Sequence, residues 1–162
     1  MFSLKKIKKN KYTKGIALLF SVIVSSLLLT IALSVLNTAM KELNFTISAR
    51  STGNSLFAAD SGIECALGND KSESTVFAKN NMGIKTINCN RNEINVIGEY
   101  PVFGFNVVGL GDDGQSCALV SVLKDPEDSI TKVVSKGYNL GGNNNCDQLG
   151  LNSTERVIEV NY

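Results

Sequence analysis

The 162-residue chain contains no histidine, no tryptophan and only two prolines. Histidine is the commonest general base and a usual zinc ligand, so its absence excludes histidine-containing catalytic triads and the ordinary imidazole zinc site. The sequence also shows no glycine-rich phosphate-binding loop and no nucleophile motif in a recognisable frame. We therefore expect a protein that is not an enzyme and that uses no cofactor.

Acidic residues are missing from positions 1–15, which hold six lysines. The whole chain has 16 basic and 15 acidic side chains, so the remainder carries ten basic and fifteen acidic groups, a net charge of −5. A surface that follows a nucleic-acid backbone needs a basic stripe, which an acidic remainder does not supply. The near-neutral total is the average of a basic leader, residues 1–15, and an acidic body, and we predict no nucleic-acid partner.

A long uncharged run follows the lysines. Residues 16–36 contain no charged side chain, and the run continues to Met40. A helix of about 20 apolar residues rises about 30 Å, which is the thickness of the hydrocarbon core of a bilayer. Because lysine clusters stay on the cytoplasmic side, residues 16–40 predict a single-pass helix with the following residues outside the cytoplasm. A cleaved signal peptide with a mature start near Val35 is an alternative, although its apolar core spans only about 7–15 residues.

The helical character continues to residue 68. Apolar residues recur at spacings close to three, four or seven, and no proline interrupts residues 16–68. The members of this apolar series are Met40, Leu43, Ile47, Leu56, Ile63 and Leu67. Residues 41–68 therefore predict an amphipathic continuation of the same helix. The small residues at 58, 59, 61, 62 and 66 would let a sheet approach that helix closely.

This arrangement resembles a known family of envelope proteins. A basic leader ending in Lys14-Gly15, an apolar helix and an amphipathic continuation are similar to the class III signal and helix of type IV pilins and type II secretion pseudopilins. The resemblance covers residues 10–68 and implies the α+β type IV pilin fold, with a long N-terminal helix over residues 16–68 packed against a small antiparallel sheet. It also implies that a prepilin peptidase cuts between Gly15 and Ile16 and that Ile16 is then N-methylated.

Two departures from the major-pilin pattern point to a minor subunit. The fifth residue after the cut is Phe20, where major pilins carry a glutamate, and the helix lacks their proline. The stretch from Phe57 to Leu67 is similar to that of minor pilins and tip pseudopilins. The resemblance implies a position at the filament tip or in assembly initiation.

The same resemblance implies partners and a location. The partners are other pilin subunits through the N-terminal helix, the prepilin peptidase, the inner-membrane assembly platform and the membrane itself. The chain would lie in a bacterial-type cytoplasmic membrane with its head outside the cytoplasm, and then in a cell-surface or periplasmic filament. The alternative is an uncleaved, signal-anchored envelope protein whose β head binds a ligand, a surface or DNA.

Residues 69–162 predict a β-rich head outside the cytoplasm. Short segments rich in valine, isoleucine and phenylalanine are separated by turns of asparagine, glycine and aspartate. The predicted strands are 84–89, 93–97, 101–108, 117–123, 131–138 and 156–162. Residues 111–114 and 125–128 predict hairpin connections, and residues 139–152 a long loop. Successive hairpins predict an antiparallel sheet.

Four cysteines lie beyond the apolar run, in a compartment where disulfides persist. Four cysteines allow three pairings, and their spacing contains no Cys-x-x-Cys motif for a zinc site. We favour Cys65–Cys89, which ties the helix end to the first strand, and Cys117–Cys146. The hairpin near residue 127 places Cys117 opposite Tyr138, and the following loop can return Cys146 to that edge.

Asp112 and Asp113 lie in a glycine-flanked turn and are weak calcium candidates. Calcium needs six to eight oxygen ligands, and only two carboxylates are local here. The sequence therefore predicts a solvated hairpin turn and no metal site.

Overall fold

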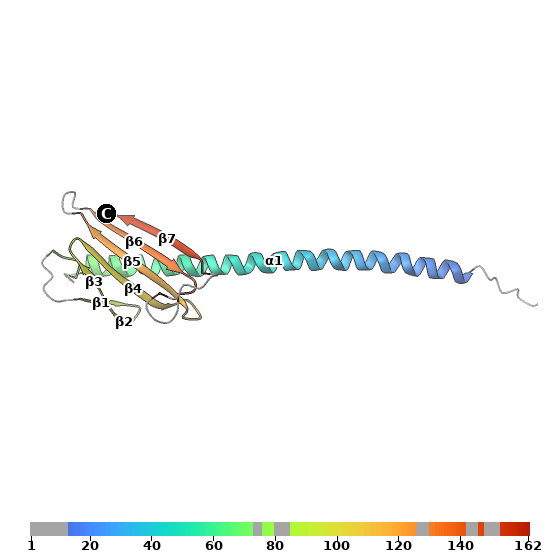
Figure 1. Cartoon of the computed structure of the whole chain (residues 1–162), viewed down its shortest axis with the longest axis horizontal. Helices are drawn as coiled ribbons and strands as arrows, with labels where there is room; N and C mark the ends of the chain where they lie inside the picture. Colours follow the sequence, from blue (N-terminus) through green and yellow to red (C-terminus); the bar gives the residue numbers. More distant parts are fainter. Residues whose placement is uncertain (1–12, 73–75, 80–84, 126–129, 142–145, 148–152) are drawn as a thin grey trace, which may run out of the picture. The chain divides into compact units, whose positions relative to one another are not determined.

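The structure, a computed structural model, describes residues 13–72, 76–79, 85–125, 130–141, 146–147 and 153–162. Within these ranges one helix, α1 (Thr13–Lys71), is followed by seven strands, so the layout is α+β (Figure 1). The part of α1 up to Thr46 belongs to one compact unit, and residues from Ile47 to Tyr162 form the other, the head. The lysines of the leader before Thr13 lie outside the described residues.

Helix α1 extends three residues beyond each predicted end. No proline interrupts it, and its uncharged run lacks residues that compete with helical hydrogen bonding, apart from serine, threonine and one asparagine. Lys71 lies in the last turn, where a positive charge is favourable beside the carbonyl end of the helix dipole.

The strands form two antiparallel sheets. A hairpin pairs β1 (Thr86–Cys89) with β2 (Asn92–Asn95). The larger sheet has five strands in sequential order, which are β3 (Ile97–Glu99), β4 (Val102–Leu110), β5 (Ser116–Lys124), β6 (Thr131–Tyr138) and β7 (Glu155–Asn161). The predicted antiparallel sheet is confirmed, and β6 has the predicted bounds.

The predicted strand 93–97 is wrong, because the structure divides it at Val96. Residues up to Asn95 pair with β1, whereas Ile97 pairs with Gly104 of β4. Val96 is buried, and its N–H donates to the carbonyl of Lys85 at 2.6 Å. The chain thus leaves the hairpin and enters the larger sheet within one residue. The predicted start at Ile84, the turn at 126–128 and most of the loop 139–152 lie outside the described residues.

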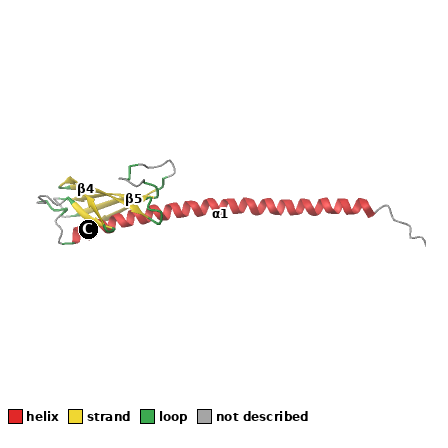
Figure 2. Ribbon diagram, turned by 90° about the horizontal axis from the view of Figure 1, so that it is seen from below, coloured by secondary structure: helices red, strands yellow, loops and turns green. Residues whose placement is uncertain are grey.

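The five-stranded sheet lies along one side of the C-terminal part of α1 (Figure 2). Small residues line the contact, since Ala58, Ala59 and Ala66 are fully buried. A Cβ on Gly137 of β6 would overlap backbone atoms of α1. A Cβ on Gly62 would overlap the hydroxyl of Ser135, also on β6. The close approach predicted from the small residues is confirmed.

Few of the large apolar residues in the predicted helical series contribute to the core. Of the predicted series, only Ile63 and Leu67 pack against the core. The other four residues of the series are exposed: Met40, Leu43, Ile47 and Leu56. The backbones of α1 and β6 are too close to admit large side chains, so the sheet provides most of the bulk.

The bulk of the core comes from β4 and β5. Phe103, Phe105 and Val107 of β4 are buried on the face toward α1. Phe77, which follows α1, packs edge-on against Phe103 at 5.5 Å between ring centroids and stacks on Phe105 at 6.3 Å. Successive side chains of a strand point to opposite faces of the sheet, so Cys117 and Tyr138 lie on the face away from α1. We call this face the outer face.

Candidate functional site: the processing junction, the apolar segment and the head

The predicted cleavage junction lies in the first turn of α1. The helix begins at Thr13, so the bond between Gly15 and Ile16 is inside the helix and not before it. Ile16 is 71% exposed, and a Cβ on Gly15 would meet no atom within 4 Å. The junction is therefore open to a partner in the described structure.

The apolar segment after the junction is uncovered. Its large hydrophobic side chains, from Ile16 to Leu36, are all exposed, including Phe20 at the fifth position after the junction. Exposure of so many apolar side chains to water is unfavourable by about 25 cal/mol per Å². This segment is long and apolar enough to span a membrane. Its surface requires either lipid or apolar protein as its neighbour.

Four hydroxyl groups in the segment or just after it are satisfied locally. Ser21, Ser26 and Thr30 each donate to the carbonyl three residues earlier at 2.8 Å. Thr38 donates to the carbonyl of Ser34 at 3.1 Å. These hydroxyls therefore need no water, which lowers the free energy of placing the segment in an apolar environment.

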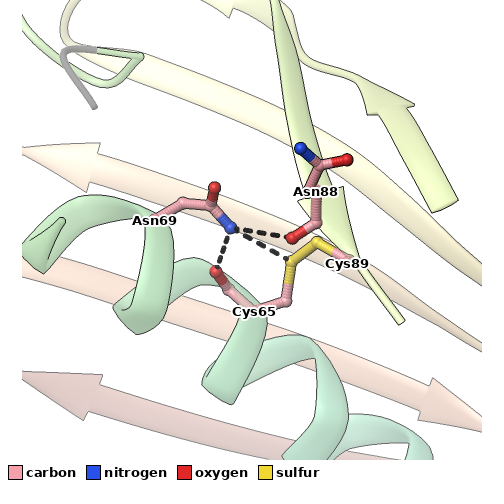
Figure 3. The surroundings of a disulfide bond; sticks show 4 residues. All are labelled: Cys65, Asn69, Asn88 and Cys89. Carbon is pink, nitrogen blue, oxygen red and sulfur yellow. Dashed lines mark hydrogen bonds between the residues drawn. A yellow bond between two sulfur atoms is a disulfide. The ribbon is translucent and has the colours of Figure 1, made fainter. Parts of the chain in front are cut away.

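The head contains both favoured disulfides. Cys65 of α1 joins Cys89 of β1, with 5.6 Å between the two Cα atoms. Figure 3 shows Asn69 beside this bond, where its amide nitrogen donates to the carbonyl of Cys65 at 2.9 Å and to that of Asn88 at 3.4 Å. The disulfide and Asn69 together attach the hairpin β1–β2 to the helix.

The second disulfide lies on the outer face of the sheet. Cys117 stands opposite Tyr138 in register, as predicted, and Cys117 joins Cys146 with 5.8 Å between Cα atoms. These three residues form a small buried cluster, which Val108 and Leu119 border. The bond holds the connection between β6 and β7 against the sheet.

The calcium candidates do not assemble a cation site in the described structure. The carboxylate of Asp113 lies 3.7 Å from the guanidinium of Arg50, and both side chains are exposed. Within the described ranges, no three potential ligands from histidine, cysteine, aspartate and glutamate come together. Asp112 instead borders a cleft described below.

Sequence reasoning missed a polar clasp at the end of α1. The carboxylate of Asp70 accepts hydrogen bonds from the ammonium of Lys124 on β5 at 2.5 and 2.6 Å and from the hydroxyl of Tyr162 at 2.6 Å. The pKa of Tyr162 is raised above its usual range. The larger cause is burial of the phenol, and the second is its hydrogen bond to Asp70. Partners separated by 54 and 92 residues leave no local sequence signal for such a group.

A second polar group attaches α1 to the connection between β6 and β7. The Asn139 amide donates to the hydroxyl of Ser51 at 2.7 Å, and that hydroxyl lies 2.8 Å from the hydroxyl of Thr154. The N–H of Thr154 donates to the Asn139 side chain at 2.6 Å. Together the clasp and this group hold both ends of the packed part of the helix.

Tyr138 predicts a pH dependence of stability. Its hydroxyl donates to the carboxylate of Glu155 at 2.5 Å, and burial, followed by this hydrogen bond and the charge of Glu155, raises the pKa of Tyr138 to about 12. The folded pKa exceeds the unfolded value of about 10, so the contribution is fully present below pH 10 and is lost as the pH rises through about 12. We expect the free energy of unfolding, measured in urea, to fall as the pH rises above 10.

Replacing Tyr138→Phe should flatten this decline and lower the stability at pH 8 by about 1.5 kcal/mol, the contribution of a hydrogen bond to a charged group. The matched control is Asn161→Ala on β7, which removes a hydrogen bond to Glu159 at 3.4 Å and no group that titrates in the alkaline range. The hydrogen bonds from Lys132 and then from Asn161 lower the pKa of Glu159, which titrates far below this range. Equal alkaline slopes in the wild type and in Tyr138→Phe would contradict the assignment.

Comparison of the chain with protein families, with curated proteins and with solved structures found no match.

Proposed function

We propose that this chain is a minor pilin or pseudopilin, a structural subunit of a type IV pilus or of a type II secretion-like filament. The observation that carries the proposal is α1 itself. One helix joins an uncharged, fully exposed apolar segment to a part that packs beneath an antiparallel sheet. Such a helix serves in a bilayer before assembly and among the helices of other subunits afterwards.

In this proposal the leader sets the orientation and is then removed. The lysines stay in the cytoplasm, the helix crosses the cytoplasmic membrane once, and the head lies outside, where its two disulfides persist. The prepilin peptidase cuts between Gly15 and Ile16, and Ile16 is N-methylated. Loss of six lysines removes the charge that would oppose extraction of the helix from the bilayer.

Transfer into a filament then exchanges lipid for protein around the apolar segment. Small side chains such as Ser25, Ser26 and Ala32 allow neighbouring helices to approach closely. Phe20 replaces the glutamate that would pair with the amine of a neighbouring subunit, which favours a position at the tip or in initiation at the assembly platform. The role proposed is structural and not catalytic.

Mass spectrometry of the N-terminus tests the proposal. When the full chain is expressed with a prepilin peptidase, we expect a mature protein that begins at methylated Ile16. A start at Met1 would instead support the uncleaved signal-anchored protein, and a start at Val35 an exported soluble protein. Gly15→Leu should accumulate as precursor, because a side chain obstructs access to the scissile bond.

Gly53→Leu is the matched control for that variant. Gly53 is also an exposed glycine of α1 with no atom within 4 Å of an added Cβ. Gly53→Leu should be processed like the wild type.

The position in the filament needs a separate test. A tagged protein that is spread evenly along filaments, at the abundance of the main subunit, would contradict the tip assignment.

A further inference from the structure

A polar cleft in the head lies beside the Cys65–Cys89 disulfide. We call it the disulfide cleft. It has a volume of about 710 Å³, and it is bordered by three segments. The first is one face of α1 from Phe57 to Asn69, with Ser72 just after the helix. The second is the end of β1 with Asn90, and the third is the end of β4 with Gly111 and Asp112 after it. Its volume is within the range of about 300–1,000 Å³ that is usual for small-ligand sites.

The backbone around the disulfide cleft is specialised. Asn90 has a φ of 49°, and Gly109 and Gly111 have φ values of 71° and 78°. A residue other than glycine in the left-handed region is uncommon, and such residues concentrate at turns and binding sites. Three left-handed residues thus shape two sides of one cleft.

The charge of the described lining residues disfavours an anionic ligand. None of the described residues that border the cleft is lysine or arginine, whereas Glu64 and Asp112 both carry carboxylates. These two carboxylates would repel an anion such as phosphate or a sulfated sugar. The cleft therefore suits a neutral or a positively charged molecule.

Hydrogen bonding favours the neutral molecule. Asn90 contributes an amide, which both donates and accepts, and the carboxylates only accept. The backbone carbonyl of Asn88 accepts from Asn69, and the Asn88 side chain points away from Cys65 (Figure 3). An organic cation presents donors alone, so it would leave the Asn90 N–H groups without an acceptor. The hydroxyls of a sugar donate to the carboxylates and accept from the Asn90 amide. Both carboxylates are on exposed residues, where solvent reduces attraction for a cation.

An aromatic ring completes the cleft. Phe57 is 56% exposed although it belongs to the part of α1 that packs beneath the sheet. Its ring borders the cleft and offers an apolar face to the C–H groups of a sugar ring. We propose that the disulfide cleft binds a neutral oligosaccharide, with Phe57 as the stacking surface and the Asn90 amide and the carboxylates of Glu64 and Asp112 as hydrogen-bonding partners. The proposal does not depend on filament assembly, because every residue of the cleft lies in the head.

A glycan array tests the proposal with the full-length protein. The protein is held in a detergent without a sugar headgroup and probed with neutral, acidic and amine-bearing oligosaccharides. We expect binding to neutral members, and the dissociation constant is then measured by calorimetry. Failure of every neutral oligosaccharide to bind, or binding of only the acidic or amine-bearing ones, overturns the proposal.

Variants locate the binding site. Gly68 borders the cleft and a Cβ there meets no atom within 4 Å, so Gly68→Gln places a side chain into the cleft without a clash. We expect it to raise the dissociation constant at least about tenfold, and Phe57→Ala to raise it by about tenfold. Gly53→Gln and Leu56→Ala are the matched controls, because both positions are exposed on α1 outside the cleft.

The dissociation constants of the two control variants should lie within about twofold of the wild-type value. Each control should also unfold at the same temperature as the cleft variant with which it is matched, Gly68→Gln or Phe57→Ala. Unchanged binding in Gly68→Gln overturns the proposal, and so does an equal loss in Gly68→Gln and Gly53→Gln. The N-terminal mass is measured separately, so a failure here is distinct from a failure of the proposed processing.

Discussion

Gly137→Ala is expected to lower the free energy of unfolding of the head by about 3–4 kcal/mol. A Cβ at this position of β6 would overlap the carbonyl oxygen of Ser55 and the backbone nitrogen of Ala59. Both are backbone atoms of a helix, so neither can move without displacing α1 from the sheet. Urea unfolding followed by the near-ultraviolet circular dichroism of the head tyrosines measures the loss.

Gly104→Ala is the control for that variant. Gly104 lies on the neighbouring part of the same sheet, and its added Cβ would lie 3.5 Å from the carbonyl oxygen of Val120, an ordinary contact. We expect a change of less than about 1 kcal/mol there. Similar losses in the two variants would show that strand glycines matter for sheet formation in general and not for the approach of α1.

Removing either disulfide is expected to lower the stability by about 3.5 kcal/mol, the chain-entropy estimate for loops of this size. The bridged cysteines are 24 and 29 residues apart, so the two losses should be similar. A domain of this size is stable by about 5–15 kcal/mol, so loss of both bonds, about 7 kcal/mol together, should remove about half of that stability or more. The variants are Cys65→Ser with Cys89→Ser, and Cys117→Ser with Cys146→Ser.

Reduction of the wild type provides the control for the serine variants. The reduced protein should unfold at the same urea concentration as the variant with four serines. Peptide mapping without reduction should recover the two pairs seen in the structure. A peptide that joins Cys65 to Cys117 or to Cys146 would contradict the pairing.

Local pattern was sufficient to predict much of this fold. Residues 131–138 form a short run with the β-branched residues Thr131, Val133 and Val134 between two turns, and β6 has those bounds. The same hairpin reasoning placed Cys117 opposite Tyr138. Both results depend on β-prone residues and short connections, which a sequence displays directly.

Other features depended on distance in space. Residues 93–97 read as one strand, and only the pairing of Asn95 with β1 and of Ile97 with β4 shows that the chain changes sheets at Val96. Leu56 fits the helical period yet is exposed, because the packed face is defined by Gly137 on a distant strand. The disulfide cleft likewise brings together residues from three segments, and no segment alone predicts it.

The place where α1 begins has a consequence for the proposed processing. Gly15 and Ile16 lie among the first four residues of the helix, whose N–H groups have no carbonyl one turn earlier within it. A peptidase needs an extended substrate, and drawing this bond into its active site unwinds only the end of α1, which fewer hydrogen bonds hold than any interior turn. The proposed cut would remove the carbonyls of Thr13, Lys14 and Gly15 as acceptors and would leave the rest of the hydrogen-bond ladder of α1 unchanged.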